Sequence, residues 1–280
     1  MTSLLKWVRL IGSRTTLYGL LILTSVFMIL PFIWMLSTSF KPEYEIFAQP
    51  PILVSRNMSL DGYRYIINNG AIRALWNTVF VSSTFTVFSL FFCALGGYGF
   101  AKYRFPGRGP LFAFLLGTMI IPGAVTMVPS YILMLKLGWI DSYYPLIVPG
   151  AANAFGIFFM RQYISTISDE LLDAARIDGC SEFATFWRVV FPICAPGLIT
   201  LGLLYFMGSW NEYLWPLIIL KTPAKFTLPL LMTSMQGPPG YSAYREWMAL
   251  AVVSVVPLLI IFVVFQRRFT EGITAGAVRG

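Results

Sequence analysis

The sequence predicts an all-α integral membrane protein with six transmembrane helices. Of its 280 residues, 57% are hydrophobic and only 11% are charged, whereas soluble domains usually carry about 25% charged residues. Long stretches hold no charge, for example between Arg14 and Lys41 and between Arg73 and Lys102. Lipid is therefore the expected solvent for most of the chain, because a soluble core could not bury this much apolar surface.

Six apolar segments are long enough to cross the hydrocarbon layer, which takes about 20 residues of helix. We expect spans near residues 16–38, 75–98, 110–135, 143–161, 196–220 and 247–266. The fifth contains one acid, Glu212. A mid-helix acid costs about 2.5–3.5 kcal/mol, and each surrounding Leu, Ile or Phe offsets about 0.3–0.6 kcal/mol of that cost. The fifth segment is therefore expected to insert.

The basic residues predict the orientation of these spans. With six spans, twelve of the twenty Lys and Arg residues fall on the side that holds both termini, and the loop 101–109 on that side has no acid. Both termini and the segment 162–195 are therefore expected in the cytoplasm. The net charge of +8 follows from these flanking residues, so no nucleic-acid partner is expected.

The composition argues against catalysis within this chain. It has no histidine and no GxxxxGK[ST] run, which removes histidine triads, histidine metal sites and a phosphate-binding loop. The cysteines, Cys93, Cys180 and Cys194, lack metal-ligand spacing. We expect no catalytic residue and no metal site.

A charged island interrupts the apolar sequence at residues 163–195. Ser168 is a suitable N-cap for a first helix, and Gly179 is suited to end it. Ser181 can cap a second helix, in which apolar residues recur at i, i+3, i+4 and i+7: Phe183, Phe186, Trp187 and Val190. On periodicity alone, this stripe packs against the protein's own helices, lies on the membrane or contacts a partner.

The residues of this island resemble the EAA loop of binding-protein-dependent ABC importers, and we therefore call residues 163–195 the coupling segment. The matching positions are Asp173, Ala174, Ala175, Asp178, Gly179, Cys180, Phe186, Pro192 and Pro196. Asp173 stands where that family usually has Glu, and Cys180 stands where a smaller residue is common. Three other stretches are similar to the carbohydrate-type, maltose-like smaller permeases: Tyr98 to Gly107, Trp210 to Pro216 and Gln266 to Gly280.

The resemblance implies the fold of a type I ABC importer transmembrane domain, in a multi-pass permease of the prokaryotic plasma membrane. Asp173 would pair with a basic group on a cytoplasmic ATPase, Ala174 and Ala175 would allow close helix approach, and Gly179 would form the turn. Phe186 and Trp187 would fill apolar contacts, with Asp178 and Pro192 completing the motif. The implied partners are a second homologous permease, two ATPase subunits that carry ATP and Mg, and an extracytoplasmic solute-binding protein, with no cofactor in this chain.

Two further sets of residues are candidate sites. Trp210, Asn211, Glu212 and Tyr213 are either part of the substrate path or structural and interface residues. The glycine-rich tail is either a disordered end or, by the resemblance, an extension between the ATPase subunits. Its candidate residues are Gly272, Thr274, Gly276 and Gly280.

The predicted organisation has three parts. Residues 1–71 hold the N-terminal tail, first span and first extracytoplasmic loop; 72–266 form the importer core and include the coupling segment; 267–280 form the cytoplasmic tail. The predicted function is the permease subunit of a carbohydrate importer that works by alternating access. The alternative is an ion-coupled secondary transporter, which would be expected to show several buried carboxylates and an internal repeat.

Overall fold

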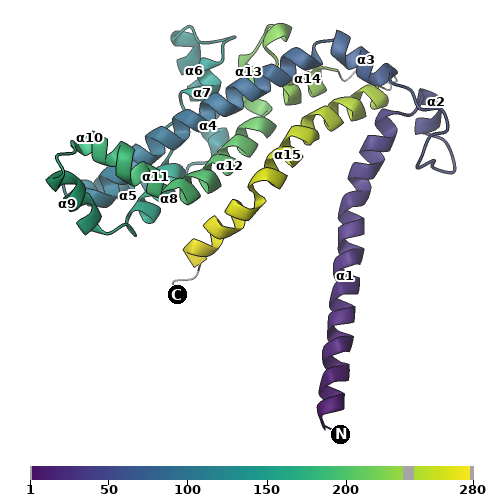
Figure 1. Cartoon of the computed structure of the whole chain (residues 1–280). Coiled ribbons are helices and arrows are strands. Elements are labelled where there is room, and N and C mark those ends of the chain that lie inside the picture. The colour runs from purple at the N-terminus through teal and green to yellow at the C-terminus, as the bar shows by residue number, and fades with distance from the viewer. Residues whose placement is uncertain (1, 236–242, 278–280) are drawn as a thin grey trace. The chain divides into compact units, whose positions relative to one another are not determined.

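The computed structural model describes the backbone of residues 2–235 and 243–277, and the side chains of 16–235 and 243–266 (Figure 1). These residues form helices and connecting loops, with no β-strand among them, which confirms the all-α prediction. The chain divides into two compact units. One comprises residues 1–69 and 234–255, and the other comprises 70–233 and 256–280.

The first unit is built around the end of the N-terminal helix. It contains α1 (Thr2–Ser39), α2 (Glu43–Ile46), α3 (Asp61–Asn68) and the beginning of α15 (Tyr244–Ala277). The ammonium of Lys41 lies 4.1 Å from the centre of the Trp34 ring, and the hydroxyls of Ser39 and Tyr63 are 2.8 Å apart. The most apolar window of α1 has no buried residue, so its side chains present the kind of surface that lipid or another subunit covers.

The second unit holds the remaining helices. Its first half contains α4 (Ala71–Lys102), α5 (Arg108–Thr118), α6 (Gly123–Lys136), α7 (Tyr144–Ile147) and α8 (Ala154–Ile164). The coupling segment follows as α9 (Asp169–Ile177), α10 (Glu182–Thr185), the π-helical turn η1 (Phe186–Val190) and α11 (Phe191–Ile193). The chain then forms α12 (Ala195–Asn211), α13 (Leu214–Ile219), the 3₁₀ turn η2 (Pro223–Lys225), α14 (Leu228–Ser234) and the rest of α15.

The main core of this unit lies where α4, α8 and α12 meet the coupling segment. Two glycines allow α4 and α8 to approach closely. A Cβ on Gly97 would lie 2.8 Å from the backbone nitrogen of Arg161, and a Cβ on Gly156 would lie 2.6 Å from the sulfur of Cys93. At Gly97 a larger side chain would meet backbone and require a shift of the helices, and at Gly156 it would displace neighbouring side chains.

Three of the six predicted spans are long single helices. The structure has α1 over 16–39, α4 over 71–102 and α15 over 244–266 as helices long and apolar enough to cross a membrane. Counting each bent helix pair as one span, the described residues provide up to five. The other three predicted spans are each interrupted within the described residues, and the all-helical class is confirmed.

The predicted span 110–135 is two helices, α5 and α6, bent by 97°. Pro122 stands at the break as the N-cap of α6. It explains the break, because proline has no backbone N–H to donate and disfavours helical backbone at the residue before it. The segment 143–161 is split into α7 and α8, with Pro149 and Gly150 between them and Asn153 capping α8 through a 2.9 Å bond from the Gly156 N–H.

The predicted span 196–220 ends early, at Asn211, and restarts as α13. Pro216 explains the break, because it has no N–H for the carbonyl of Glu212 four residues before it. The same proline is tolerated in the first turn of α13, because the backbone N–H groups of a first turn have no acceptor within the helix.

The contact between α4 and α8 generates a test of the fold. Gly97→Ala should lower the thermal stability of the detergent-solubilised protein, because overpacking costs about 1–3 kcal/mol, more than the roughly 1 kcal/mol that alanine gains over glycine in a helix. Gly99→Ala, on the same helix with no atom near its added Cβ, is the control and should be neutral or stabilising. Equal melting temperatures for the two variants would contradict the close contact.

Candidate functional site

The coupling segment forms the predicted helix–glycine–helix unit. Helix α9 ends in a Schellman motif: the Gly179 N–H donates to the carbonyl of Arg176 and the Cys180 N–H donates to that of Ala175, each at 3.0 Å. Gly179 has φ +83° and open space around its Cα. Its requirement for glycine therefore comes from the left-handed backbone and not from crowding.

The second helix begins as the sequence predicts. The hydroxyl of Ser181 accepts a bond of 3.3 Å from the N–H of Ala184, which caps α10. Ser168 occupies the N-cap position of α9 but its side chain makes no capping bond. Only one of the two predicted serine caps is confirmed.

Arg176 joins the two helices across the glycine turn. Its Nη1 lies 2.8 Å from Oδ1 of Asp173, one turn earlier on α9, and its Nε lies 2.9 Å from Oε1 of Glu182 on α10. The bond from Arg176, with a second bond from the Tyr103 hydroxyl, holds the pKa of the Glu182 carboxyl below its ordinary value. Glu182 is therefore ionised at neutral pH, and this link weakens only as the pH falls into the acid range.

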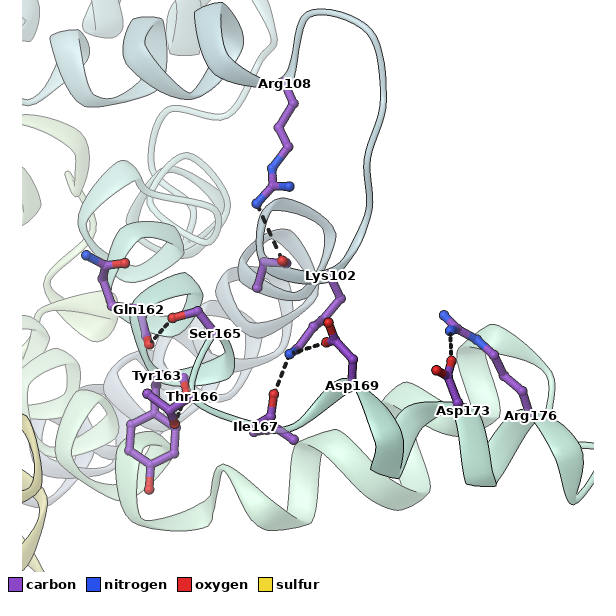
Figure 2. Close-up of polar contacts among 11 residues, drawn as sticks. Lys102, Arg108, Gln162, Tyr163, Ser165, Thr166, Ile167, Asp169, Asp173 and Arg176 are labelled. Atoms are coloured by element: carbon purple, nitrogen blue, oxygen red, sulfur yellow. Dashed lines mark hydrogen bonds and ion pairs between the residues drawn. The ribbon is translucent and has the colours of Figure 1, made fainter.

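The end of α4 fixes the coupling segment from the side (Figure 2). Lys102 Nζ lies 2.7 Å from Oδ1 of Asp169, and it also donates to the carbonyl of Ile167. The hydroxyl of Tyr103 donates to Glu182. One short stretch of α4 and the loop after it thus holds both helices of the unit.

Aromatic packing anchors the second helix. Phe186 and Val190 are fully buried, and the Phe186 ring lies 5.5 Å from the ring of Tyr98 on α4. The π-helical turn η1 includes these residues, with the Phe191 N–H bonded to the carbonyl of Phe186. Pro192 explains the widened turn, because it has no N–H for the carbonyl of Arg188.

The coupling segment continues into α12 without a flexible linker. The helices on either side of Cys194 are bent by 78°, yet backbone bonds run through the bend, from the Cys194 N–H to Val190 at 3.0 Å and from the Leu198 N–H to Cys194 at 2.8 Å. Cys194 itself is buried. A displacement of α10 would therefore be passed on to α12.

The opposite side of the unit is exposed. Ala175 and Phe186 are buried, whereas Ala174, Asp178 and Gly179 are exposed, and the Asp173 side chain is 64% exposed. Three apolar side chains on the unit also face outward: Ile177 at 87%, Phe183 at 59% and Trp187 at 49%. This surface is therefore both acidic and apolar, and ordered helices carry the exposed rings of Phe183 and Trp187.

The four candidate path residues are consecutive in sequence but have different environments in the structure. Trp210 is buried and packs 5.4 Å from Phe206, while Asn211 donates 2.8 Å to the carbonyl of Met207 in its own helix. Tyr213 is 43% exposed. Of the four, Glu212 lines a cavity of about 300 Å³.

Glu212 is not in the middle of a helix, as the sequence suggested. It is the C-cap of α12, and its Oε1 accepts bonds from the N–H groups of Leu214 and Trp215 at 3.0 and 3.2 Å. The carboxylate thus caps the start of α13, where helix dipoles favour negative charge.

The tail residues are only partly described. Backbone helix continues in α15 through Gly272, Thr274 and Gly276, and Gly280 lies outside the described residues. The proposed extension toward an ATPase dimer stays a prediction.

Sequence reasoning missed the residues that brace the unit: Lys102, Tyr103, Arg176 and Glu182. The acid–base pair of Asp173 and Arg176 at i, i+3 is a signal that could have indicated one of these contacts. Within the described residues, no cluster of three or more His, Cys, Asp or Glu side chains could hold a metal ion.

Comparison with known proteins identifies the family of this chain. The model of the family described as "Binding-protein-dependent transport system inner membrane component" matches residues 12–274. The chain belongs to this family. Membership agrees with the position of the helix–glycine–helix unit between apolar helices, and it does not favour the secondary-transporter alternative.

Individual relatives cover nearly the whole chain. The arabinooligosaccharide transport permease AraQ of Halalkalibacterium halodurans is 34% identical over all of this chain and 98% of its own length. AraQ of Bacillus subtilis is 36% identical over 95% and 96% of the two chains. A solved chain of a bacterial ABC transporter that imports the acidic polysaccharide alginate is 26% identical, with a TM-score of 0.83 over 93% of this chain and 97% of its own.

The Lys102 contacts generate a test of how the unit is held. Lys102→Met should increase hydrogen exchange over residues 169–177, because the carbonyl of Ile167 and the carboxylate of Asp169 lose their shared cation. Lys102→Arg keeps the charge and should restore most of the protection. If Lys102→Met exchanged like the unaltered protein, aromatic packing alone would hold α9.

Proposed function

We propose that this chain is the permease subunit of an ATP-driven carbohydrate importer and forms half of its translocation pathway. Family membership supports the transport function, and the sugar transport systems of the relatives support a carbohydrate. The observation that carries the proposal is the braced helix–glycine–helix unit, exposed on one side and continuous with α12 on the other.

The exposed side is suited to a protein partner with a basic group and an apolar cleft. Asp173 is 64% exposed although it is paired with Arg176, and Ile177 and Phe183 are the more exposed apolar side chains beside it. A cation on a cytoplasmic ATPase would share Asp173 with Arg176, and the apolar residues would lose water on docking. Asp173 is thus the proposed ionic contact, with Ala174 allowing close approach.

Closure of the ATPase would move α9 and α10 as one body. Arg176 ties the two helices together, while Lys102 and Tyr103 tie them to α4. The backbone bonds around Cys194 carry the same motion into α12. Because α4 and α12 are themselves packed together, the displacement would tilt these membrane helices together and alternate access to the pathway.

The remaining parts of the importer are assigned to partners. ATP and Mg would bind two ATPase subunits, a second homologous permease would complete the pathway, and an extracytoplasmic binding protein would deliver the solute. The distribution of Lys and Arg supports a cytoplasmic location for both termini and the coupling segment. The tail after Thr270 would lie near the ATPase pair.

The assembly can be tested by purification from native membranes with a tag at the N-terminus. Mass spectrometry should detect an ABC ATPase, a second permease and a solute-binding protein with this chain. The reconstituted assembly should take up a labelled oligosaccharide only when ATP is present. Recovery of the chain alone, or uptake that follows an ion gradient without ATP, would contradict the proposal.

The turn at Gly179 provides a sharper test of coupling. Gly179→Val should lower ATP-dependent uptake by about tenfold or more, because a β-branched residue is strongly disfavoured at φ +83°. Gly179→Asn is the matched control, since asparagine tolerates left-handed backbone, and it should retain most activity. Membrane insertion of both variants should be normal by detergent extraction and gel filtration. Full uptake by Gly179→Val would exclude the turn from coupling.

A further inference from the structure

One arginine on the exposed side of the coupling segment is bonded to two carboxylates. Arg176 pairs with Asp173 one turn earlier on α9 and with Glu182 across the glycine turn, and Figure 2 shows the side chains of Asp173 and Arg176 turned toward each other. The side chains of all three are open to solvent, at 64% for Asp173, 39% for Arg176 and 52% for Glu182. A partner that covers Asp173 would therefore also remove water from Arg176 and its second carboxylate.

The two carboxylates hold the arginine unequally. Glu182 accepts two bonds from Arg176, one from Nε at 2.9 Å and one from Nη2 at 3.3 Å. Asp173 accepts one bond, from Nη1 to Oδ1 at 2.8 Å, and its Oδ2 makes no bond within the described residues. Two parallel bonds between a guanidinium and a carboxylate fix the geometry better than one. Arg176 is therefore held on the Glu182 side, and Asp173 keeps an oxygen for a further cation.

Glu182 is itself fixed and charged. The Tyr103 hydroxyl donates to the Oε2 atom of Glu182, and Tyr103 directly follows α4. The bonds from Arg176 and Tyr103 hold the pKa of the Glu182 carboxyl below its ordinary value. Glu182 therefore offers a full negative charge at a set position beside Arg176 when a partner approaches.

The charges of these three residues do not cancel. Two carboxylates and one guanidinium leave the group with one net negative charge. Asp169, the acid at the start of α9, does not add to this group, because Lys102 lies 2.7 Å from its carboxylate. The group is therefore balanced by one additional cation, which the unbonded oxygen of Asp173 can accept.

We propose that Glu182 sets the charge of the ATPase contact, so that Asp173 takes one basic group of the ATPase while Arg176 stays in place. A charge that is buried in an interface without a counter-charge is costly. With Glu182 ionised, docking of one lysine or arginine makes the group neutral. Without Glu182, Arg176 and the incoming cation would share one carboxylate and repel each other. Glu182 is thus a positioning residue for docking, and this role rests on the proposed ATPase contact.

A bracing role alone makes a different prediction. In that case the bonds of Glu182 would only hold α10 against α9 and α4, and loss of Glu182 or Arg176 would weaken docking because the unit becomes looser. Loss of both residues would then be no better than loss of one. The charge role predicts the opposite, because removal of both leaves Asp173 and the incoming cation as a neutral pair.

The test is a double-substitution cycle in the complete importer. The purified assembly is diluted, and the concentration at which half of its ABC ATPase has dissociated is measured. Glu182→Gln and Arg176→Gln should each raise this concentration by about tenfold, because each leaves one uncompensated charge in the contact. The double variant should return to within about threefold of the unaltered importer, and ATP-dependent uptake in liposomes should follow the same order.

Two further variants separate the position of the charge from the total charge. Glu170→Gln removes the same charge from α9, but Glu170 is exposed and makes no bond to Arg176 in the part of the chain that the structure describes. It should change the dissociation by less than about twofold. Glu182→Asp keeps the charge on a shorter side chain and should retain more affinity than Glu182→Gln. An effect of Glu170→Gln as large as that of Glu182→Gln would contradict the assignment of this charge to Glu182.

The double variant decides between the two roles. If it holds the ATPase no more tightly than the tighter of the two single variants, the charge role is overturned and Glu182 is a brace. Unchanged dissociation in both single variants would also overturn the charge role. Neither result affects the proposed function, which fails if no ABC ATPase purifies with the unaltered chain, and that failure would overturn both.

Discussion

The close contact between α4 and α8 is the constraint on which the second unit depends. At Gly97 the added Cβ of any other residue would lie 2.7 Å from the Cβ of Met160, so the two helices pack nearly backbone to backbone. In a membrane, association between helices relies on such close packing because lipid is as apolar as the side chains. The contact fixes α4 against α8, and α12 and the coupling segment complete the same core.

Helix α4 connects two sites that are far apart along its length. Its 32 residues span about 48 Å at 1.5 Å per residue. Asn77 and Thr78 near one end bond the segment that leads into α14, and Lys102 at the other end holds α9. A single stiff helix therefore contacts both the segment that leads into α14 and the proposed ATPase contact.

The sequence predicted what local patterns specify. The glycine turn at 179 and the cap at Ser181 follow from capping preferences, and the structure has both. The helical period of the aromatic stripe left its contacts open, and the structure buries Phe186 against α4 while Phe183 and Trp187 are exposed. The breaks at Pro122 and Pro216 were not predicted, because both prolines lie within long, continuously apolar segments. Both breaks carry a local signal, since proline removes a backbone donor wherever it lies.

Other features could not be predicted from local pattern. Lys102 and Asp169 are 67 residues apart in sequence, so their pairing depends on how α4 and α9 pack. The Thr78 hydroxyl and the Leu228 N–H that it accepts from are 150 residues apart, and only the folded chain brings them together. Arg176 makes one contact of each kind: its pair with Asp173 is local in sequence, and its bond to Glu182 crosses the glycine turn.

The cysteines give the coupling turn a practical property. Cys93 and Cys194 are buried, while Cys180, directly after Gly179, is partly exposed. Thiol reagents react with accessible cysteines far more readily than with buried ones. The natural sequence therefore carries its own attachment point for a fluorophore or spin label, at the turn that a docking ATPase would cover, and no engineered cysteine is required.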